Sequence, residues 1–389
     1  MLRLLLTALL MVLLSGCSMF GAKDNADPPA ELVEFEAVFE VETLWDLSVA
    51  GSDEKFLAIR PTVQDGRLFI ADPDGEVMAV DTASGDEIWS KETDSELTGG
   101  PGVVGNLVLV GTGEAELLAL DVESGDERWR RQVSSEVLSS PAGESGIAVV
   151  RTTDGRVIGL DAGTGDSRWN FDRSVPVLTL RGNSSPVVKD SQVFVGFANG
   201  KLACLALDTG NLLWESVIAT SHGRTELERV VDIDADPVLV EDTVYAGSFQ
   251  GGIAAISESS GVVLWKRKIS THAGLDASWR EVYVTDSEDH IWALDATNGA
   301  TLWQQQALHA RRLSAPAIVD DYLVVGDLEG YLHWLAREDG RMLARTRPGG
   351  DGIRTKPLVV DGVVYVFDQN GRVIALQAKP AEPESDDPE

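Results

Sequence analysis

The sequence contains few of the residues on which disulfides, metal sites and nucleic-acid binding depend. Its 389 residues include two cysteines, Cys17 and Cys204, and five histidines whose spacing matches no metal-binding motif. Acidic residues outnumber basic ones by 63 to 32, which gives a formal net charge of −31. This balance argues against a nucleic-acid partner, because such proteins present basic patches to the phosphates. The acidity either keeps the protein soluble or steers it toward a basic partner.

Long stretches with helical periodicity are also missing after the N-terminus. Short runs rich in Val, Leu and Ile instead alternate with Gly, Asp and Asn clusters, and the chain contains 38 glycines. Such runs are typical of short strands joined by tight turns. The sequence therefore predicts an all-β fold.

The N-terminus carries a targeting signal. Arg3 precedes the apolar run 4–14, which is too short to span a membrane, and Leu14-Ser15-Gly16-Cys17 follows. This arrangement resembles a bacterial lipoprotein signal, which implies removal of residues 1–16 and acylation of Cys17. An ordinary secretory signal that happens to contain a cysteine is the alternative. Ser18 lacks the acidic character of an inner-membrane retention signal, so the resemblance implies the periplasmic side of the outer membrane.

The two ends of the mature chain read as extensions of a central domain. Residues 17–39 are interpreted as a lipidated tether, and residues 378–389 as a disordered acidic tail. Residues 40–377 form the domain itself.

An internal repeat occupies this domain. Proline and tryptophan recur 28 positions apart in five units: Pro61 to Trp89, Pro101 to Trp129, Pro141 to Trp169, Pro186 to Trp214 and Pro237 to Trp265. Two further units keep the frame, with Leu275 in place of the proline before Trp303 and Ala344 in place of the tryptophan after Pro316. An eighth unit begins at Pro357. Each complete unit has four strand patterns separated by turn signals, which is typical of a propeller blade.

The eighth unit contains only three strand patterns, whereas Trp45 lies in a strand pattern that no complete unit precedes. We therefore predict an eight-bladed β-propeller of four-stranded antiparallel blades, whose last blade is closed by the N-terminal strand. Such pairing would hide two open sheet edges.

One position in the third strand pattern is small in seven units, where we expect inner strands to crowd around the axis: Ala79, Ala119, Gly159, Cys204, Ala255, Ala293 and Ala375. Cys204 is therefore interpreted as a core residue and not as a nucleophile. Trp334 is the exception, and the sequence offers no account of it.

The segments "ALDVESGDERW" (119–129) and "GLDAGTGDSRW" (159–169) resemble the PQQ-like repeat of quinoprotein dehydrogenases, which are eight-bladed propellers. In that family the tryptophan docks between neighbouring blades. A lipoprotein signal followed by eight such repeats is similar to the BamB family of outer-membrane protein assembly factors. The resemblance implies a non-enzymatic scaffold without cofactors that belongs to the β-barrel assembly machine and assists insertion of β-barrel proteins.

A periplasmic quinoprotein or a ligand-binding propeller is the alternative function. The best metal candidate, Asp232-Ile-Asp234-Ala-Asp236, starts like a calcium loop, but Pro237 and Thr243 stand where glycine and glutamate are needed. No adjacent cysteine pair and no defensible catalytic triad is present in the sequence. A propeller lipoprotein that scaffolds a different envelope complex is a third possibility.

The connections between units vary in length, and the two longest are consecutive. They span 17 positions from Trp169 to Pro186 and 23 positions from Trp214 to Pro237. Connections of this kind emerge on one face of a propeller, so these two should be neighbours, and long loops on rigid scaffolds often carry function.

Within these loops, "LTLRG" (178–182) and "DIDADP" (232–237) are similar to the BamB segments that contact BamA through a POTRA domain. The resemblance implicates Leu178, Leu180, Arg181, Asp232 and Asp234 in partner binding. Two alternatives stay open at this point. The leucines could plug the propeller mouth while the aspartates cap turns, and Arg181 could pair with the aspartates or with the partner.

Overall fold

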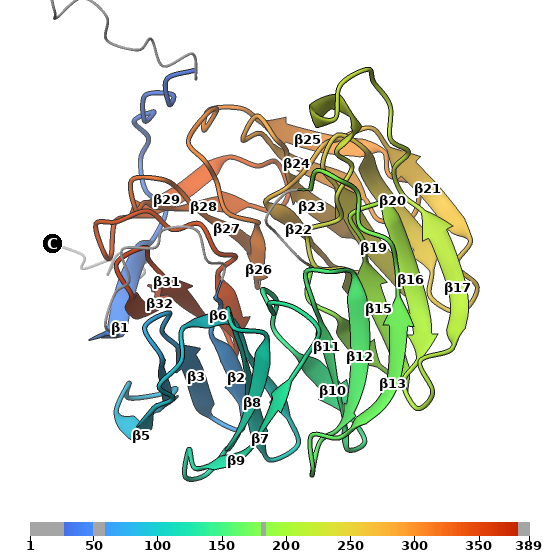
Figure 1. The fold of residues 1–389 in the computed structure, drawn as a ribbon. Helices are drawn as coiled ribbons and strands as arrows, with labels where there is room; N and C mark the ends of the chain where they lie inside the picture. The colour runs from blue at the N-terminus through green and yellow to red at the C-terminus, as the bar shows by residue number, and fades with distance from the viewer. Residues whose placement is uncertain (1–26, 50–58, 180–183, 380–389) are drawn as a thin grey trace, which may run out of the picture.

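The computed structural model describes residues 27–49, 59–179 and 184–379, and these residues form a closed ring of eight antiparallel sheets (Figure 1). Each sheet has four strands, which confirms the predicted eight-bladed propeller. Cys17, Leu180 and Arg181, which the sequence assigns to lipid attachment and partner binding, lie outside the described residues.

Blades 1 to 7 each consist of four strands that are consecutive in the chain. Blades 1 to 4 contain β2 (Thr62–Gln64), β3 (Arg67–Ala71), β4 (Glu76–Asp81) and β5 (Glu87–Glu92); β6 (Leu97–Val104), β7 (Leu107–Thr112), β8 (Glu116–Asp121) and β9 (Glu127–Gln132); β10 (Ala142–Glu144), β11 (Ile147–Arg151), β12 (Arg156–Asp161) and β13 (Ser167–Asp172); β14 (Val187–Lys189), β15 (Gln192–Gly196), β16 (Lys201–Ala206) and β17 (Leu212–Val217). Blades 5 to 7 contain β18 (Val238–Val240), β19 (Thr243–Ser248), β20 (Gly252–Ser257) and β21 (Val263–Arg267); β22 (Gly274–Ala277), β23 (Glu281–Thr285), β24 (Ile291–Asp295) and β25 (Thr301–Gln305); β26 (Ala317–Val319), β27 (Tyr322–Gly326), β28 (Leu332–Ala336) and β29 (Met342–Thr346).

Blade 8 joins the two ends of the chain. Its strands are β30 (Leu358–Val360), β31 (Val363–Phe367), β32 (Arg372–Lys379) and β1 (Glu40–Ser48). β1 pairs antiparallel with β32 from Glu40 opposite Lys379 to Ser48 opposite Arg372, which confirms closure by the N-terminal strand. β32 extends past the predicted domain boundary at residue 377.

The first strand of each blade lines the axis of the ring, and the fourth lies at the rim. The turn between the first two strands uses residues that tolerate the left-handed backbone conformation. Asp65 and Gly66 have φ of 50° and 74°, and Asp361 and Gly362 repeat the pattern at 51° and 77°. Two consecutive positive φ values match the twist of the flanking strands, which explains the recurrent Asp-Gly signal.

The fourth-strand tryptophans join each blade to the next. Trp89 donates its indole Nε1–H to the carbonyl of Val122 at 2.9 Å, and its ring covers Gly125 in the turn that precedes β9. Seven tryptophans repeat both contacts around the ring: Trp45, Trp89, Trp129, Trp169, Trp214, Trp265 and Trp303. The tryptophans therefore dock between neighbouring blades, as the family resemblance implied.

The small third-strand residues also owe their size to these tryptophans. Each lies directly opposite a tryptophan of the neighbouring strand, as in the pairs Ala79–Trp89 and Cys204–Trp214. A Cβ atom at Gly159 would lie 2.1 Å from the ring of Trp169. The expectation that the position is small because of crowding at the axis is wrong, because the third strand is not the innermost one. Cys204 is a fully buried core residue, and burial raises the pKa of its thiol to about 12.

Trp334 is explained by the closure of the ring. It lies on the third strand of blade 7 opposite Ala344, so the large and small residues have exchanged places. The third and fourth strands of blade 8 come from opposite ends of the chain, so no turn glycine joins them to receive a tryptophan from blade 7. Trp334 packs instead edge-to-face against Phe39, just before β1, at 5.7 Å between ring centroids.

Replacing a docking glycine should therefore weaken the ring more than replacing an uncrowded one. In Gly125→Ala the added Cβ would lie 2.6 Å from the Trp89 ring, whereas Gly105 has a comparable φ of +61° and no atom within 4 Å of the added carbon. Both alanines bear the left-handed backbone cost of about 1–2 kcal/mol. We expect Gly125→Ala to lose about 1–3 kcal/mol more in urea unfolding, because overpacking adds to that cost. Equal losses in the two variants would contradict the docking role.

Candidate protein-interaction surface

Two long connections lie side by side on one face of the ring. Loop A, residues 173–186, joins blades 3 and 4, and loop B, residues 218–237, joins blades 4 and 5. Loop B rises at the upper right of Figure 1. The loops touch each other where the Ser185 amide N–H donates to Asp236 Oδ1 at 2.6 Å. The predicted adjacency of the two loops is confirmed.

Loop B is fixed to blade 4 by an apolar contact. Ile233 is fully buried, its amide donates to the Phe197 carbonyl at 3.3 Å, and its side chain packs onto Gly196. A Cβ atom at residue 196 would lie 2.3 Å from Ile233. The glycine at the end of β15 therefore makes room for the loop.

A buried arginine from blade 3 lies beneath both loops. Arg151, at the end of β11, donates from Nη1 to the carbonyl and the hydroxyl of Ser184 in loop A, both at 3.3 Å. Its guanidinium lies 5.5 Å from the centroid of the Phe197 ring. Burial lowers the pKa of Arg151 to about 10, so it remains a cation at neutral pH, and the carboxylates of Asp232, Asp234 and Asp236 oppose that shift.

Sequence reasoning missed this arginine, although a signal was present. The residues at the equivalent register position in the other blades are uncharged: Ala71, Gly111, Gly196, Gly247, Thr285, Gly326 and Phe367. A charged residue at this position indicates a buried carboxylate nearby, because buried charges are normally paired.

The two candidate aspartates of loop B point inward. The side chain of Asp232 is 1% exposed. Burial, together with the neighbouring Asp232, raises the pKa of Asp234 to about 8, while Arg151 acts in the opposite direction. Both aspartates therefore lie against the buried arginine under the loops and do not form an exposed acidic patch.

The apolar side chains of the loops point outward. Val177 is 96% exposed and Leu178 is 41% exposed in loop A, and Leu227 is 65% exposed in loop B. Leu227 was not singled out from the sequence. It begins the 3₁₀ turn η1 (Leu227–Arg229), where Thr225 Oγ1 accepts from the Glu228 amide, and Glu228 Oε2 accepts from the Thr225 amide. This reciprocal cap and the hydrogen bond from Gln250 to the Leu227 carbonyl hold the exposed leucine in place.

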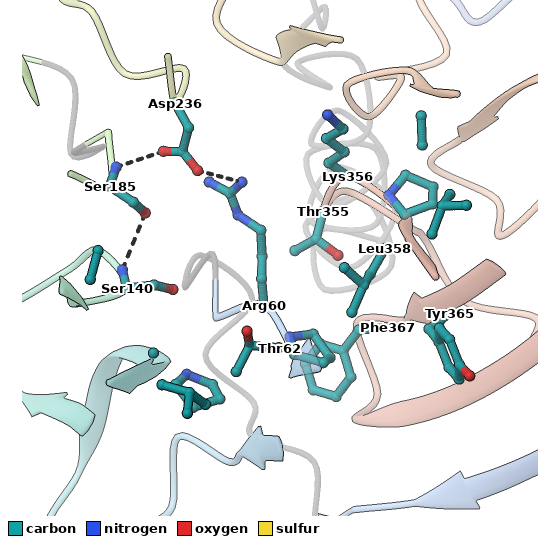
Figure 2. A pocket seen from close by; sticks show the side chains of 18 of the residues that line it. Arg60, Thr62, Ser140, Ser185, Asp236, Thr355, Lys356, Leu358, Tyr365 and Phe367 are labelled. Carbon is teal, nitrogen blue, oxygen red and sulfur yellow. Dashed lines mark hydrogen bonds and ion pairs between the residues drawn. The ribbon is translucent and has the colours of Figure 1, made fainter. Parts of the chain in front are cut away.

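The axial cavity is the other candidate site, as Figure 2 shows. It has a volume of about 580 Å³ and is lined by residues of all eight blades or of the segments just before them. Its charged groups pair across the ring, Arg60 with Asp236 at 2.8 Å and Lys356 with Asp276 at 3.0 Å. Among the described residues, no group of three or more His, Cys, Asp or Glu side chains is placed to hold a metal ion.

The aspartates of the calcium-like motif are likewise used separately. Asp232 and Asp234 lie near Arg151, whereas Asp236 binds Arg60 and the Ser185 amide.

Within the described residues, no helix is both long and apolar enough to cross a membrane.

The sequence profile described as outer membrane protein assembly factor BamB matches residues 40–98, 73–305 and 293–383. The chain belongs to the BamB family. The BamB of Pseudomonas aeruginosa is 48% identical over 361 residues, which cover 92% of this chain and 94% of the relative. The BamB of Escherichia coli is 35% identical over 386 residues, which cover 96% and 98% of the two chains.

Solved structures show the same fold. The crystal structure of BamB from Moraxella catarrhalis matches with a TM-score of 0.80 at 24% identity, over 87% of this chain and all of that one. The quinohemoprotein alcohol dehydrogenase of Comamonas testosteroni matches with a TM-score of 0.65 at 14% identity, over 90% of this chain and 78% of that one. The curated BamB relatives are named as assembly factors and not as enzymes.

The Asp234 carboxyl group, whose Oδ2 atom is buried, should make the stability of this BamB-family protein depend on pH. Its pKa is raised from 3.8 to about 8, so the folded chain retains a proton that the unfolded chain releases above about pH 4. Stability should therefore fall as pH rises from about 4 to about 8. We expect Asp234→Asn to flatten this slope. The difference in free energy of urea unfolding between the variant and the wild type should then be more favourable to the variant at about pH 8 than at about pH 5, by at least about 1 kcal/mol.

The exposed Asp208, for which the same substitution to Asn changes no buried charge, is the control. A slope that persists in Asp234→Asn would contradict the burial of this carboxyl group.

Proposed function

We propose that this chain is a lipid-anchored, non-enzymatic scaffold of the β-barrel assembly machine, which binds BamA through loops A and B on the periplasmic side of the outer membrane. Membership of the BamB family supports the general role. The observation that carries the finer proposal is the exposure of the apolar residues Val177 and Leu178 in loop A and Leu227 in loop B, above a buried support.

The arrangement suits protein recognition because the anchors are apolar and their support is rigid. A few well-packed side chains at the centre of an interface supply most of its binding energy, and this centre is more apolar than the rim. Arg151 and the buried aspartates hold the loops from below, so less conformational freedom is lost on binding. We therefore assign Leu178 and Leu180 to direct contact with BamA, Asp232 and Asp234 to loop shape, and Arg181 to the same surface.

Substitutions in loop A should separate binding from stability. We expect Leu178→Ala combined with Leu180→Ala, and separately Arg181→Glu, to abolish co-purification with BamA while the thermal unfolding midpoint changes little. The matched control is Leu44→Ala combined with Ile88→Ala, which removes two exposed apolar side chains from the rims of blades 8 and 1. A large loss of stability in the loop variants would favour the alternative in which the leucines plug the propeller mouth.

A second interaction, with unfolded barrel proteins, is favoured by the rims of blades 4 to 6. Their fourth strands are open sheet edges that expose apolar side chains: Leu212, Leu213, Val217, Val263, Leu264 and Leu302. At the corresponding rim positions, β9 has Glu127 and Arg128, and β13 has Ser167 and Arg168. Open apolar edges can pair with an extended strand of a client, whereas charged edges discourage pairing.

Photocrosslinking tests this second interaction. A crosslinking residue placed at Leu213 or Leu264 should capture an unfolded outer-membrane porin, whereas the same residue at Arg128 or Arg168 should capture much less. Capture that is equal at all four positions, or missing from all of them, would contradict client pairing at these edges.

A further inference from the structure

The segment that precedes β1 lies along blade 7 and is bonded to it and to the connection before it. We call residues 27–39 the strap. The Ala30 amide donates to the His309 carbonyl at 3.0 Å, and the Val38 amide donates to the Leu343 carbonyl in β29 at 2.8 Å. Figure 1 shows the strap as the blue segment that descends past β29 into β1. The sequence assigned these residues to the tether with no role beyond spacing.

Arg311, in the connection between β25 and β26, and Arg345, in β29, donate hydrogen bonds to carbonyl groups of the strap. Arg311 is almost fully buried and donates to the Ala30 carbonyl at 2.8 Å, while its other nitrogens bind Asp327 and Glu329. Arg345 donates to the Val33 carbonyl at 2.7 Å. Releasing the strap would break the charge-assisted hydrogen bond between the Arg311 guanidinium and the Ala30 carbonyl, and such bonds favour the bound state.

The strap also has an inward and an outward apolar side. Leu32 packs against the core between blades 6 and 7, the Phe35 ring lies 5.0 Å from the Arg345 guanidinium, and Phe39 contacts Trp334. Val33 and Val38 are about half exposed. A segment with some apolar side chains packed inward and others exposed is one that binds the propeller in a defined position.

The strap determines where the N-terminal chain leaves the ring. Asp27 lies 3.8 Å from His309, which belongs to the connection between β25 and β26. This connection joins a fourth strand to the next first strand, as loops A and B do. The chain therefore enters the strap on the loop face, at the boundary of blades 6 and 7.

Chain length then limits where a lipid on Cys17 can lie. Ten residue steps separate Cys17 from Asp27, and a fully extended chain spans about 35 Å over that number. The rim of blades 6 and 7 is separated from the rim of blades 2 and 3 by two blades, each three strand spacings of about 4.8 Å wide, and by the axial cavity, which together exceed about 29 Å. A lipid on Cys17 can therefore lie beside blades 6 and 7 with slack in the chain, whereas reaching the rim of blades 2 and 3 would require an almost fully extended chain.

We propose that the strap orients the propeller on the membrane, so that the rim of blades 6 and 7 faces the lipid surface. This inference rests on the proposed lipid attachment at Cys17. A tether that began directly at β1 would have more than twice as many free residues and would impose no such orientation. With the strap seated, loops A and B lie on the face from which the anchor leaves, but at a different part of the ring.

Energy transfer to labelled lipids tests the orientation. The acylated full-length chain is bound to phosphatidylethanolamine–phosphatidylglycerol vesicles that carry acceptor-labelled lipids, with a donor fluorophore on Gln306→Cys or on Ser134→Cys. Both positions are exposed and lie in loop-face connections four blades apart. Cys204 is buried with a pKa of about 12, so it does not compete for the label. We expect stronger transfer from residue 306 than from residue 134.

Strap variants supply the second arm. Leu32→Ser combined with Phe35→Ser should release the strap, abolish the difference between the two donor positions and speed cleavage at Glu31, Glu34 and Glu36 by a glutamate-specific protease. Val33→Ser, which removes an outward-facing side chain of the same segment, should preserve both the difference and the slow cleavage.

Equal transfer from the two positions in the acylated, vesicle-bound protein would overturn the orienting role and leave the proposed anchor intact. The orienting role would also be overturned if the Leu32→Ser, Phe35→Ser variant is cleaved rapidly, which shows that its strap is released, and yet the uncleaved variant keeps the difference in energy transfer between residues 306 and 134. If mass spectrometry finds Cys17 without acyl chains and the protein does not bind vesicles, the proposed anchor fails, and the inference fails with it.

Discussion

The docking of a tryptophan from one blade onto a glycine of the next is the contact on which the rest of the structure depends. Each indole combines a hydrogen bond to the neighbouring blade with burial of a large ring surface. Burial of 150–250 Å² corresponds to about 4–6 kcal/mol as an upper estimate. Because the same contact recurs at seven junctions, the blades form one rigid scaffold on which irregular loops are tolerated. The exchange of Trp334 with Ala344 occurs at the one junction, among the described blades, where the receiving turn is missing.

The sequence predicted the fold well because the repeat records local requirements. Asp-Gly turns, strand patterns and the regular spacing of proline and tryptophan each reflect contacts within one blade or between two consecutive blades. Even the closure of the ring followed from counting strands. The reason for the small third-strand residues was misjudged, because the partner of each one is a tryptophan across the sheet, which strand patterns alone do not reveal.

The candidate surface was less predictable because its support is non-local. The lengths of the two loops predicted the location of the surface, and Leu178 is exposed there. The inward direction of Asp232 and Asp234 depends on Arg151, which lies in β11 of blade 3, more than 80 residues earlier in the sequence. Leu227 is presented by a capped turn whose apolar residue has no sequence pattern to distinguish it from a core position. Such features require knowing which segments meet in space.

The pairing of β1 with β32 also makes the last step of folding depend on the whole chain. Bringing together segments separated by more than 320 residues costs about 5 kcal/mol of loop-closure entropy, unless the intervening blades have already formed and brought the ends close. The pairing of β1 with β32 is therefore favoured once the intervening blades have formed. A chain that stops short of β32 keeps an open ring with two unpaired edges. Completion of the ring therefore requires the two strands that lie farthest apart in the described chain, β1 and β32.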